Sequence, residues 1–229
     1  MRWVRNFLFL LFVVGAPSEL SAEKISIDHS ELIKILVLGD SLTEGYGVAK
    51  EDSFPSQLEN ELKENYPKIK VISAGSSGST SASAYKRLKW HLKSKPQILI
   101  LALGANDGLR GISPQTTKEN LKKTIQLAKE NRIEVVLAGM QMPYNYGEEY
   151  RKSYAKTFTD LSQELKLNTI PFLLEGVGGI KEMNLADGIH PNEKGHKKIA
   201  RNISRKLQSV IKINDQKSLK GNNDKPKKE

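Results

Sequence analysis

The sequence predicts an α/β fold, a three-layer α/β/α sandwich built around a five-stranded parallel sheet. Two observations predict it. Apolar runs of strand length alternate along the chain with segments of helical periodicity, which is the pattern of parallel strands connected by helices. Several runs, such as ILVLG and ILILALG, are apolar at nearly every position, as strands are when helices cover both faces of their sheet. We therefore expect the sheet to form the middle layer.

The expected elements alternate in order along the chain. The predicted strands cover residues 33–38, 69–72, 98–103, 135–138 and, more weakly, 169–172. The predicted helices cover residues 53–66, 80–93, 114–131, 148–165 and 192–211. Proline marks two helix starts, because Pro114 follows a good N-cap in Ser113 and Pro191 precedes the last helix. Both helices then carry apolar residues at helical spacing and are expected to cover the sheet.

The length of 229 residues suits one domain, which we place at residues 23–213. Residues 1–22 combine two arginines, a short apolar run and small residues near Ala22, which are the parts of a secretory signal peptide. The apolar run is shorter than a membrane span needs, which favours cleavage near Ala22. An uncleaved membrane anchor is the alternative. Residues 214–229 have little apolar content and are predicted to form a flexible basic tail. The sequence thus predicts an exported protein, either periplasmic or secreted.

Composition excludes several classes of site and partner. The chain has no cysteine, which rules out disulfides, a thiol nucleophile and cysteine-ligated zinc. Of the formal charge of +10, residues 1–22 contribute +1 and residues 214–229 contribute +2, which leaves +7 on the body. The lysines are dispersed and form no Arg-rich, aromatic-interleaved block, so nucleic acid is not an expected partner. The charge suits solubility or peripheral contact with an anionic membrane surface or acidic ligands.

Polar residues follow the predicted strands, where parallel sheets carry their functional sites. Ser41 follows the first strand, and its hydroxyl is a candidate nucleophile, although a serine there is also an ordinary helix cap. His190, in the loop before the last helix, has an acid, Asp187, three residues upstream. That spacing allows Asp187 to orient the ring while its other nitrogen faces the serine, and a solvated surface pair is the alternative.

Two further segments carry hydrogen-bond donors at the same edge of the sheet. Gly78 follows the second strand with an N–H that no side chain obstructs, and Asn106 follows the third strand with a side-chain amide. Such donors are what an oxyanion hole requires, while turn chemistry is the alternative for each alone. Together with Ser41, Asp187 and His190 they supply a nucleophile, a base, an orienting acid and oxyanion donors. This coincidence favours acyl-transfer chemistry.

These segments resemble the signature blocks of the SGNH, or GDSL, hydrolase superfamily. The blocks are GDSL at 39–42, AGSSG at 74–78, GAND at 104–107 and DGIHP at 187–191, in that order. Residues 139–150 and 187–192 are similar to the bacterial branch of thioesterase I, lysophospholipase L1 and arylesterase. The resemblance covers residues 33–211 and implies the flavodoxin-like SGNH hydrolase fold. Ser73 departs from the pattern, since relatives often have Asn there, but it lies outside the catalytic set.

The resemblance implies a role for each site residue. Ser41 would be the nucleophile, His190 the general base and Asp187 its orienting acid. The N–H of Ser41, the N–H of Gly78 and the Asn106 side chain would form the oxyanion hole, with no metal and no cofactor. The implied activity is hydrolysis of carboxylic esters and thioesters of medium to long acyl chains. A carbohydrate O-acetyl esterase and a catalytically silent lipid-binding surface protein are the alternatives.

The substrate groove is predicted less sharply than the catalytic residues. Five side chains near the expected site are candidates to line an acyl groove, although core packing would explain them equally well. They are Leu109, Met142, Tyr144, Tyr146 and Ile189. Asp40 and Asp107 are expected to be structural and to hold turns through hydrogen bonds between side chain and backbone. The expected ligand is a small acyl ester or a lipid.

Overall fold

A computed structural model of the 229-residue chain describes residues 25–27 and 32–213. The predicted signal peptide and basic tail lie outside the described residues. The main sheet is parallel throughout, in the strand order β3-β2-β4-β5-β6. Its strands are β2 (Ile33–Gly39), β3 (Ile69–Ala74), β4 (Ile98–Ala102), β5 (Glu134–Ala138) and β6 (Asn168–Ile170). The predicted five-stranded parallel sheet is confirmed.

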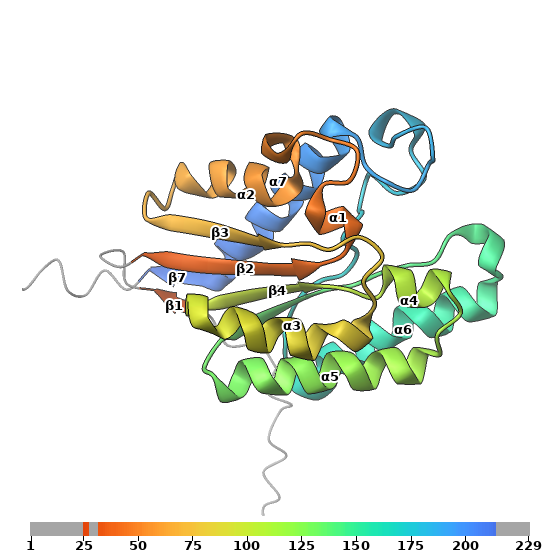
Figure 1. The fold of residues 1–229 in the computed structure, drawn as a ribbon, viewed down its shortest axis with the longest axis horizontal. Coiled ribbons are helices and arrows are strands. Elements are labelled where there is room, and N and C mark those ends of the chain that lie inside the picture. The colour runs from red at the N-terminus through yellow and green to blue at the C-terminus, as the bar shows by residue number, and fades with distance from the viewer. Residues whose placement is uncertain (1–24, 28–31, 214–229) are drawn as a thin grey trace, which may run out of the picture.

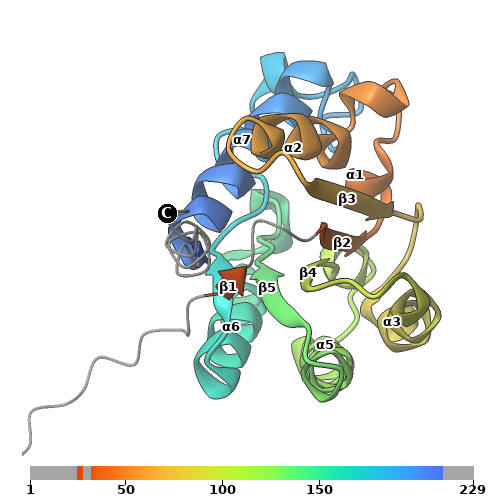
Figure 2. The ribbon, with the colours of Figure 1, turned by 90° about the vertical axis from the view of Figure 1, so that its left-hand side faces the viewer.

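Helices cover both faces of this sheet, as Figures 1 and 2 show. The α-helices are α1 (Ser41–Glu44), α2 (Phe54–Lys63), α3 (Ala84–His91), α4 (Ala105–Leu109), α5 (Pro114–Glu130), α6 (Glu148–Leu165) and α7 (Glu193–Val210). Helices α2 and α7 pack together on one face, and α3, α5 and α6 cover the other (Figure 2). The 3₁₀ segments are η1 (Lys50–Asp52), η2 (Ser81–Ser83), η3 (Leu92–Ser94), η4 (Tyr144–Tyr146) and η5 (Lys181–Met183). The three-layer sandwich is therefore confirmed.

The central strands carry the core. Every residue of β4 is buried, and Ile35 through Leu38 of β2 are fully buried, which is the two-sided covering that their apolar sequences predict. The first strand of the sheet, β2, lies between β3 and β4, so the chain passes from β2 to β3 on one side and then crosses back past β2 to β4 on the other. A doubly wound sheet binds its ligands at such a switch point, beyond the carboxyl ends of the strands.

Several predicted boundaries shift for local reasons. Strand β6 ends at Ile170, short of the predicted residue 172, because Pro171 has no N–H to continue a ladder. The predicted helix 80–93 consists of η2, α3 and η3 in succession. The last helix ends at Val210, and Ile211 instead opens β7 (Ile211–Ile213), which pairs in parallel with β1 (Ile25–Ile27). This second, two-stranded sheet is absent from the sequence prediction.

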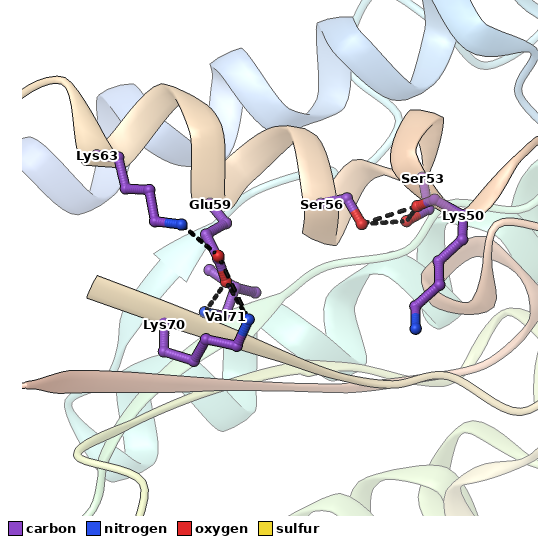
Figure 3. Close-up of polar contacts among 7 residues, drawn as sticks. All are labelled: Lys50, Ser53, Ser56, Glu59, Lys63, Lys70 and Val71. Carbon is purple, nitrogen blue, oxygen red and sulfur yellow. Dashed lines mark hydrogen bonds and ion pairs between the residues drawn. The ribbon is translucent and has the colours of Figure 1, made fainter. Parts of the chain in front are cut away.

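A side chain of α2 binds the edge of the sheet at β3. Glu59 of α2 accepts a hydrogen bond from the Val71 N–H at 2.8 Å and pairs with Lys63 at 2.6 Å and Lys70 at 3.3 Å (Figure 3). An edge strand presents N–H groups without a neighbouring strand, and a side-chain acceptor satisfies one of them. Glu59 thereby connects α2 to β3 beside the strand that leads to the site.

Candidate active site

Ser41 begins α1 directly beyond the carboxyl end of β2. Asp40 caps this short helix, since its Oδ1 accepts a hydrogen bond from the Leu42 N–H at 3.0 Å. Glycine is required at position 39, because a Cβ there would lie 1.9 Å from the Thr43 Oγ1. The turn therefore presents the half-buried Ser41 side chain at the edge of the sheet.

The side chains of Ser41, His190 and Asp187 form a continuous hydrogen-bonded series. Ser41 Oγ lies 3.0 Å from His190 Nε2, although 149 residues separate them. His190 Nδ1 lies 2.7 Å from Asp187 Oδ2. If Nδ1 donates its proton to the carboxylate, Nε2 is left as an acceptor for the serine hydroxyl. The arrangement can thus remove a proton from Ser41.

Asp187 is held ionised by its own loop. Its Oδ1 accepts hydrogen bonds from the N–H groups of Ile189 at 2.9 Å and His190 at 3.0 Å. Partial burial would raise the pKa of Asp187, but these bonds and the His190 ring outweigh burial and lower the pKa to about 2. The carboxylate that orients the ring therefore keeps its charge over the whole neutral range.

Tyr46 adds a contact to the histidine that the sequence did not indicate. Its ring centroid lies 4.5 Å from that of His190, with the two planes inclined at 39°. The tyrosine is about half exposed, at 53% of its surface. It limits the orientations that the imidazole can adopt.

The oxyanion-donor candidates lie in the loop after β3 and in α4. Gly78 has a φ of +73°, in the left-handed region that suits glycine, and follows β3. Asn106, in α4, donates one amide hydrogen to the Ser79 carbonyl at 3.1 Å, which joins its own helix to the Gly78 loop. Within the described residues, the N–H groups of Ser41 and Gly78 donate to no acceptor. Both remain available to a negatively charged oxygen.

Two acidic side chains hold the Gly78 loop in place. Glu44 at the end of α1 accepts hydrogen bonds from the Ser77 N–H at 2.7 Å and from the Ser77 hydroxyl. Asp107, fully buried in α4, accepts from the Ser81 N–H at 2.8 Å and from the Ser81 hydroxyl. Asp107 thus has the structural role expected of it, but it joins α4 to η2 and does more than form a local turn.

Arg87 connects the ends of the two strands that lead into the site. Its Nη1 donates to the Gly39 carbonyl at 2.9 Å, and its Nη2 donates to the Ala74 carbonyl. Those carbonyls immediately precede Asp40 and the Gly78 loop. Sequence reasoning missed Arg87, because nothing distinguishes it from the lysines around it in a basic helix.

The groove candidates fall into different environments. Met142 is 4% exposed and belongs to the core, where its sulfur lies against Gly108. Tyr146 is half-buried and donates its hydroxyl hydrogen to the Leu109 carbonyl at 3.2 Å, while Leu109 itself is half-buried. Tyr144 and Ile189 are exposed, at 87% and 52%. The five candidates are therefore divided among core, half-buried and exposed positions.

The described residues offer no cluster of three or more histidines, aspartates and glutamates suited to holding a metal ion. The carboxylates near the serine instead contact different partners: Asp187 contacts His190, Glu44 contacts Ser77, and Asp107 contacts Ser81.

A model of the GDSL-like lipase/acylhydrolase family matches residues 37–198, a range that includes every residue of the site described above. The chain belongs to this family.

Proteins of named activity resemble this chain over most of its length. Esterase TesA of Pseudomonas aeruginosa is 34% identical over 178 residues, which cover 77% of this chain and 89% of that protein. Thioesterase 1/protease 1/lysophospholipase L1 of Escherichia coli K12 is 31% identical over 211 residues, covering 92% and 94%.

Solved structures agree with the fold. The crystal structure of TesA matches with a TM-score of 0.74 and 35% identity, covering 77% of this chain and 99% of that one. AlinE4, an SGNH-hydrolase family esterase, matches with a TM-score of 0.66 and 33% identity, covering 78% and 96%. The GDSL-family chain is accordingly a hydrolase with the SGNH hydrolase fold.

Proposed function

We propose that this protein is a serine esterase that hydrolyses carboxylic esters and thioesters of medium to long acyl chains. One observation carries the proposal: Ser41 Oγ, the His190 ring and the Asp187 carboxylate form a hydrogen-bonded series at 3.0 Å and 2.7 Å. The named activities of its relatives, an esterase and a thioesterase/lysophospholipase, support the same reaction class.

In the first half of the reaction, His190 Nε2 takes the hydroxyl proton as Ser41 Oγ attacks the acyl carbon. The carbonyl oxygen becomes an oxyanion, which receives hydrogen bonds from the N–H groups of Ser41 and Gly78 and from the Asn106 amide. The tetrahedral intermediate then collapses. The bond to the leaving group breaks, and His190 gives its proton to the departing alcohol or thiol.

The second half regenerates the enzyme. Water loses a proton to His190 and attacks the acyl carbon of the ester on Ser41. The second tetrahedral intermediate releases the carboxylic acid, and His190 returns the proton to the serine oxygen. Asp187 stays ionised throughout, because its pKa is held at about 2, and stabilises the imidazolium that forms twice in each cycle.

The acyl chain is proposed to lie along exposed apolar side chains beside the serine. Tyr144 and Ile189 supply this surface, and Leu109 and Tyr146 supply half-buried surface next to it. A shallow groove of this kind accepts long chains, because the far end of the chain does not have to fit a closed cavity. A carbohydrate O-acetyl esterase would need only room for an acetyl group, and a silent lipid-binding protein would need no serine reactivity.

Activity against p-nitrophenyl esters of increasing chain length tests the proposal, with Ser41→Ala as the control. We expect turnover to rise from acetate to medium chains and to be lost in Ser41→Ala. An optimum at acetate with no activity on octanoate would favour the O-acetyl esterase. Binding of lipid vesicles without any ester hydrolysis would favour the silent binding protein.

We also propose that the protein is exported. The arginines, apolar run and small residues of positions 1–22 support this, and the proposed lipid and fatty-ester substrates are met outside the cytoplasm. N-terminal sequencing of the protein from separated cell fractions would test it. We expect the protein outside the cytoplasm with a new N-terminus near residue 23, and an intact cytoplasmic chain would contradict export.

A further inference from the structure

One side of α3 presents a stripe of cations with an exposed tryptophan. Ala84 and Leu88 are fully buried against the sheet. The opposite side carries the exposed residues Lys86, Lys89, Trp90 and Lys93, which we term the α3 basic face. Their spacing of three and four residues places them along one side of the helix and of η3, which continues it. Trp90 is 62% exposed, although tryptophan is highly buried on average.

No acidic residue balances this face from its own part of the chain. Residues 65–106 contain no Asp and no Glu. Lys93 Nζ lies 3.4 Å from the centroid of the Trp90 ring, a cation–π contact. Lysines elsewhere, such as Lys63 and Lys122, pair with glutamates, but the three lysines of the α3 basic face form no salt bridge within the described residues.

The positive charge continues onto the edge of the sheet where the strands begin. A hollow of about 360 Å³ lies next to η3 and carries both apolar and cationic groups. Its lining is Leu92, Lys95, Pro96, Gln97, Asn131, Arg132 and Ile133. Lys95 and Arg132 are exposed. Glu130 at the end of α5 and Glu134 at the start of β5 adjoin this lining and offset its two cations, so the net positive charge of the region comes from the lysines of the α3 basic face.

We propose that the α3 basic face and this adjoining hollow bind the surface of an anionic phospholipid bilayer. An exposed tryptophan flanked by lysines matches the chemistry of the membrane interface, where the indole lies at headgroup level and the ammonium groups meet phosphates. The apolar stems of the lysines can lie beside the indole while their charges reach the headgroups. The occupant is a lipid surface, because the face offers one solvent-exposed aromatic ring and no row of stacking platforms for nucleotide bases.

The binding is peripheral and leaves the catalytic serine accessible. Within the described parts of the chain, no helix is long and apolar enough to cross a membrane. Trp90 lies in the last turn of α3 and Lys93 in η3, just before β4 begins at Ile98, whereas Ser41 begins α1 beyond the carboxyl end of β2. Figure 1 shows α1 at the opposite end of the sheet from the end of α3 that leads into β4. Docking through α3 therefore holds the enzyme beside its lipid without covering the reaction site.

Vesicle binding by the full chain tests the proposal. Trp3 and Trp90 are the two tryptophans, so the background is Trp3→Phe, and the fluorescence then reports Trp90 alone. We expect a blue shift of that emission, and co-sedimentation, with vesicles of phosphatidylcholine plus phosphatidylglycerol but not with phosphatidylcholine alone. The triple change Lys86→Gln, Lys89→Gln and Lys93→Gln should weaken the affinity at least about tenfold, since each lysine near an anionic surface contributes roughly fivefold. Salt should weaken it further.

The matched control removes three exposed cations from the opposite face of the sheet, through Lys194→Gln, Lys197→Gln and Arg205→Gln in α7. It should bind vesicles as the parent does. Hydrolysis of a soluble ester should be unchanged in the α3 variant, which verifies folding independently of the lipid. Equal loss of binding in both variants, an unshifted Trp90 emission, or binding to duplex DNA in preference to the vesicles would overturn the proposal.

Discussion

At the scale of single residues, the reactivity of Ser41 depends on groups that approach it from three parts of the chain. The hydroxyl faces His190, whose ring contacts Asp187 and Tyr46, and the proposed oxyanion donors are Gly78 and Asn106. None of these contacts contributes a large interaction energy, since each is one hydrogen bond or one ring contact. Their effect on rate comes from being in place before the substrate binds.

Asn106→Ala tests the oxyanion hole at one residue. The change removes an amide that would bind the oxyanion, and we expect turnover to fall by about 10²- to 10³-fold with little change in KM. Steady-state kinetics on a medium-chain ester measures this, with circular dichroism to verify folding. Unchanged turnover in a folded Asn106→Ala enzyme would remove the residue from the proposed mechanism.

A second residue-scale prediction concerns stability and pH. His196 is fully buried in α7, and its Nδ1 accepts the Phe54 N–H at 3.2 Å. Burial, helped by the nearby His190 charge, lowers its pKa from 6.5 to about 4. The neutral form is therefore favoured by folding, and its contribution to stability is complete above pH 6.5 and is lost as the pH falls toward 4. The full effect is on the order of 3 kcal/mol.

His196→Asn isolates this contribution, because the Asn Oδ1 can still accept the Phe54 N–H but does not titrate. Asp40 titrates in the opposite sense. Burial raises its pKa from 3.8 to about 6 against the Leu42 hydrogen bond, so its contribution is present below pH 3.8 and lost as the pH rises through 6. Both proteins contain Asp40, so subtracting their plots of unfolding free energy against pH removes its contribution. Parallel curves for the parent and His196→Asn would contradict the prediction.

At the scale of elements, the site depends on how strand ends are joined to helices. Arg87 of α3 donates hydrogen bonds to the carbonyls at the ends of β2 and β3. We expect Arg87→Met to lower the free energy of unfolding by about 2 kcal/mol or more, because two partly buried carbonyls lose a charged donor. The turnover number should fall by a larger factor than the factor by which KM changes. Lys86→Met, one position along the same helix and exposed, should leave both quantities near the parent values.

The junction of α2 with edge strand β3 gives a further stability prediction. Glu59→Ala leaves the Val71 N–H without its acceptor, and we expect a loss of about 1 to 3 kcal/mol in chemical denaturation. Glu61→Ala is the matched change on the same helix. Glu61 pairs with the exposed Arg201 at 3.2 Å, and its removal should cost under about 1 kcal/mol. Equal losses for the two variants would show that Glu59 does not secure the edge strand.

The sequence predicted well the elements that the apolar pattern determines. It predicted less well the boundaries and strands that depend on backbone pairing. The five strands and their two-sided covering follow from runs such as residues 98–103. Pro171 could have indicated the early end of β6, since its missing N–H is visible in the sequence. Pairing of Ile211 with Ile25 could not have been predicted, because three alternating residues at the end of a helical pattern carry too little signal.

At the scale of the whole molecule, the doubly wound order of the sheet explains why distant blocks of sequence meet. Because β2 lies between β3 and β4, the loops that follow these three strands converge at one edge, and the loop before α7 adds His190. That Ser41, His190 and Asp187 lie together was therefore predictable from strand ends and family resemblance. The supporting contacts of Arg87 and Glu44 were not, since each depends on which carbonyl or N–H lies within reach.

The proposed mechanism requires Ser41 to be a nucleophile activated by His190. The most direct measurement is labelling with a fluorophosphonate probe followed by mass spectrometry of the intact protein and its peptides. We predict one adduct, on Ser41, absent in Ser41→Ala and formed far more slowly in His190→Ala. A folded parent enzyme that does not react, or that carries the label on a different serine, would contradict the account.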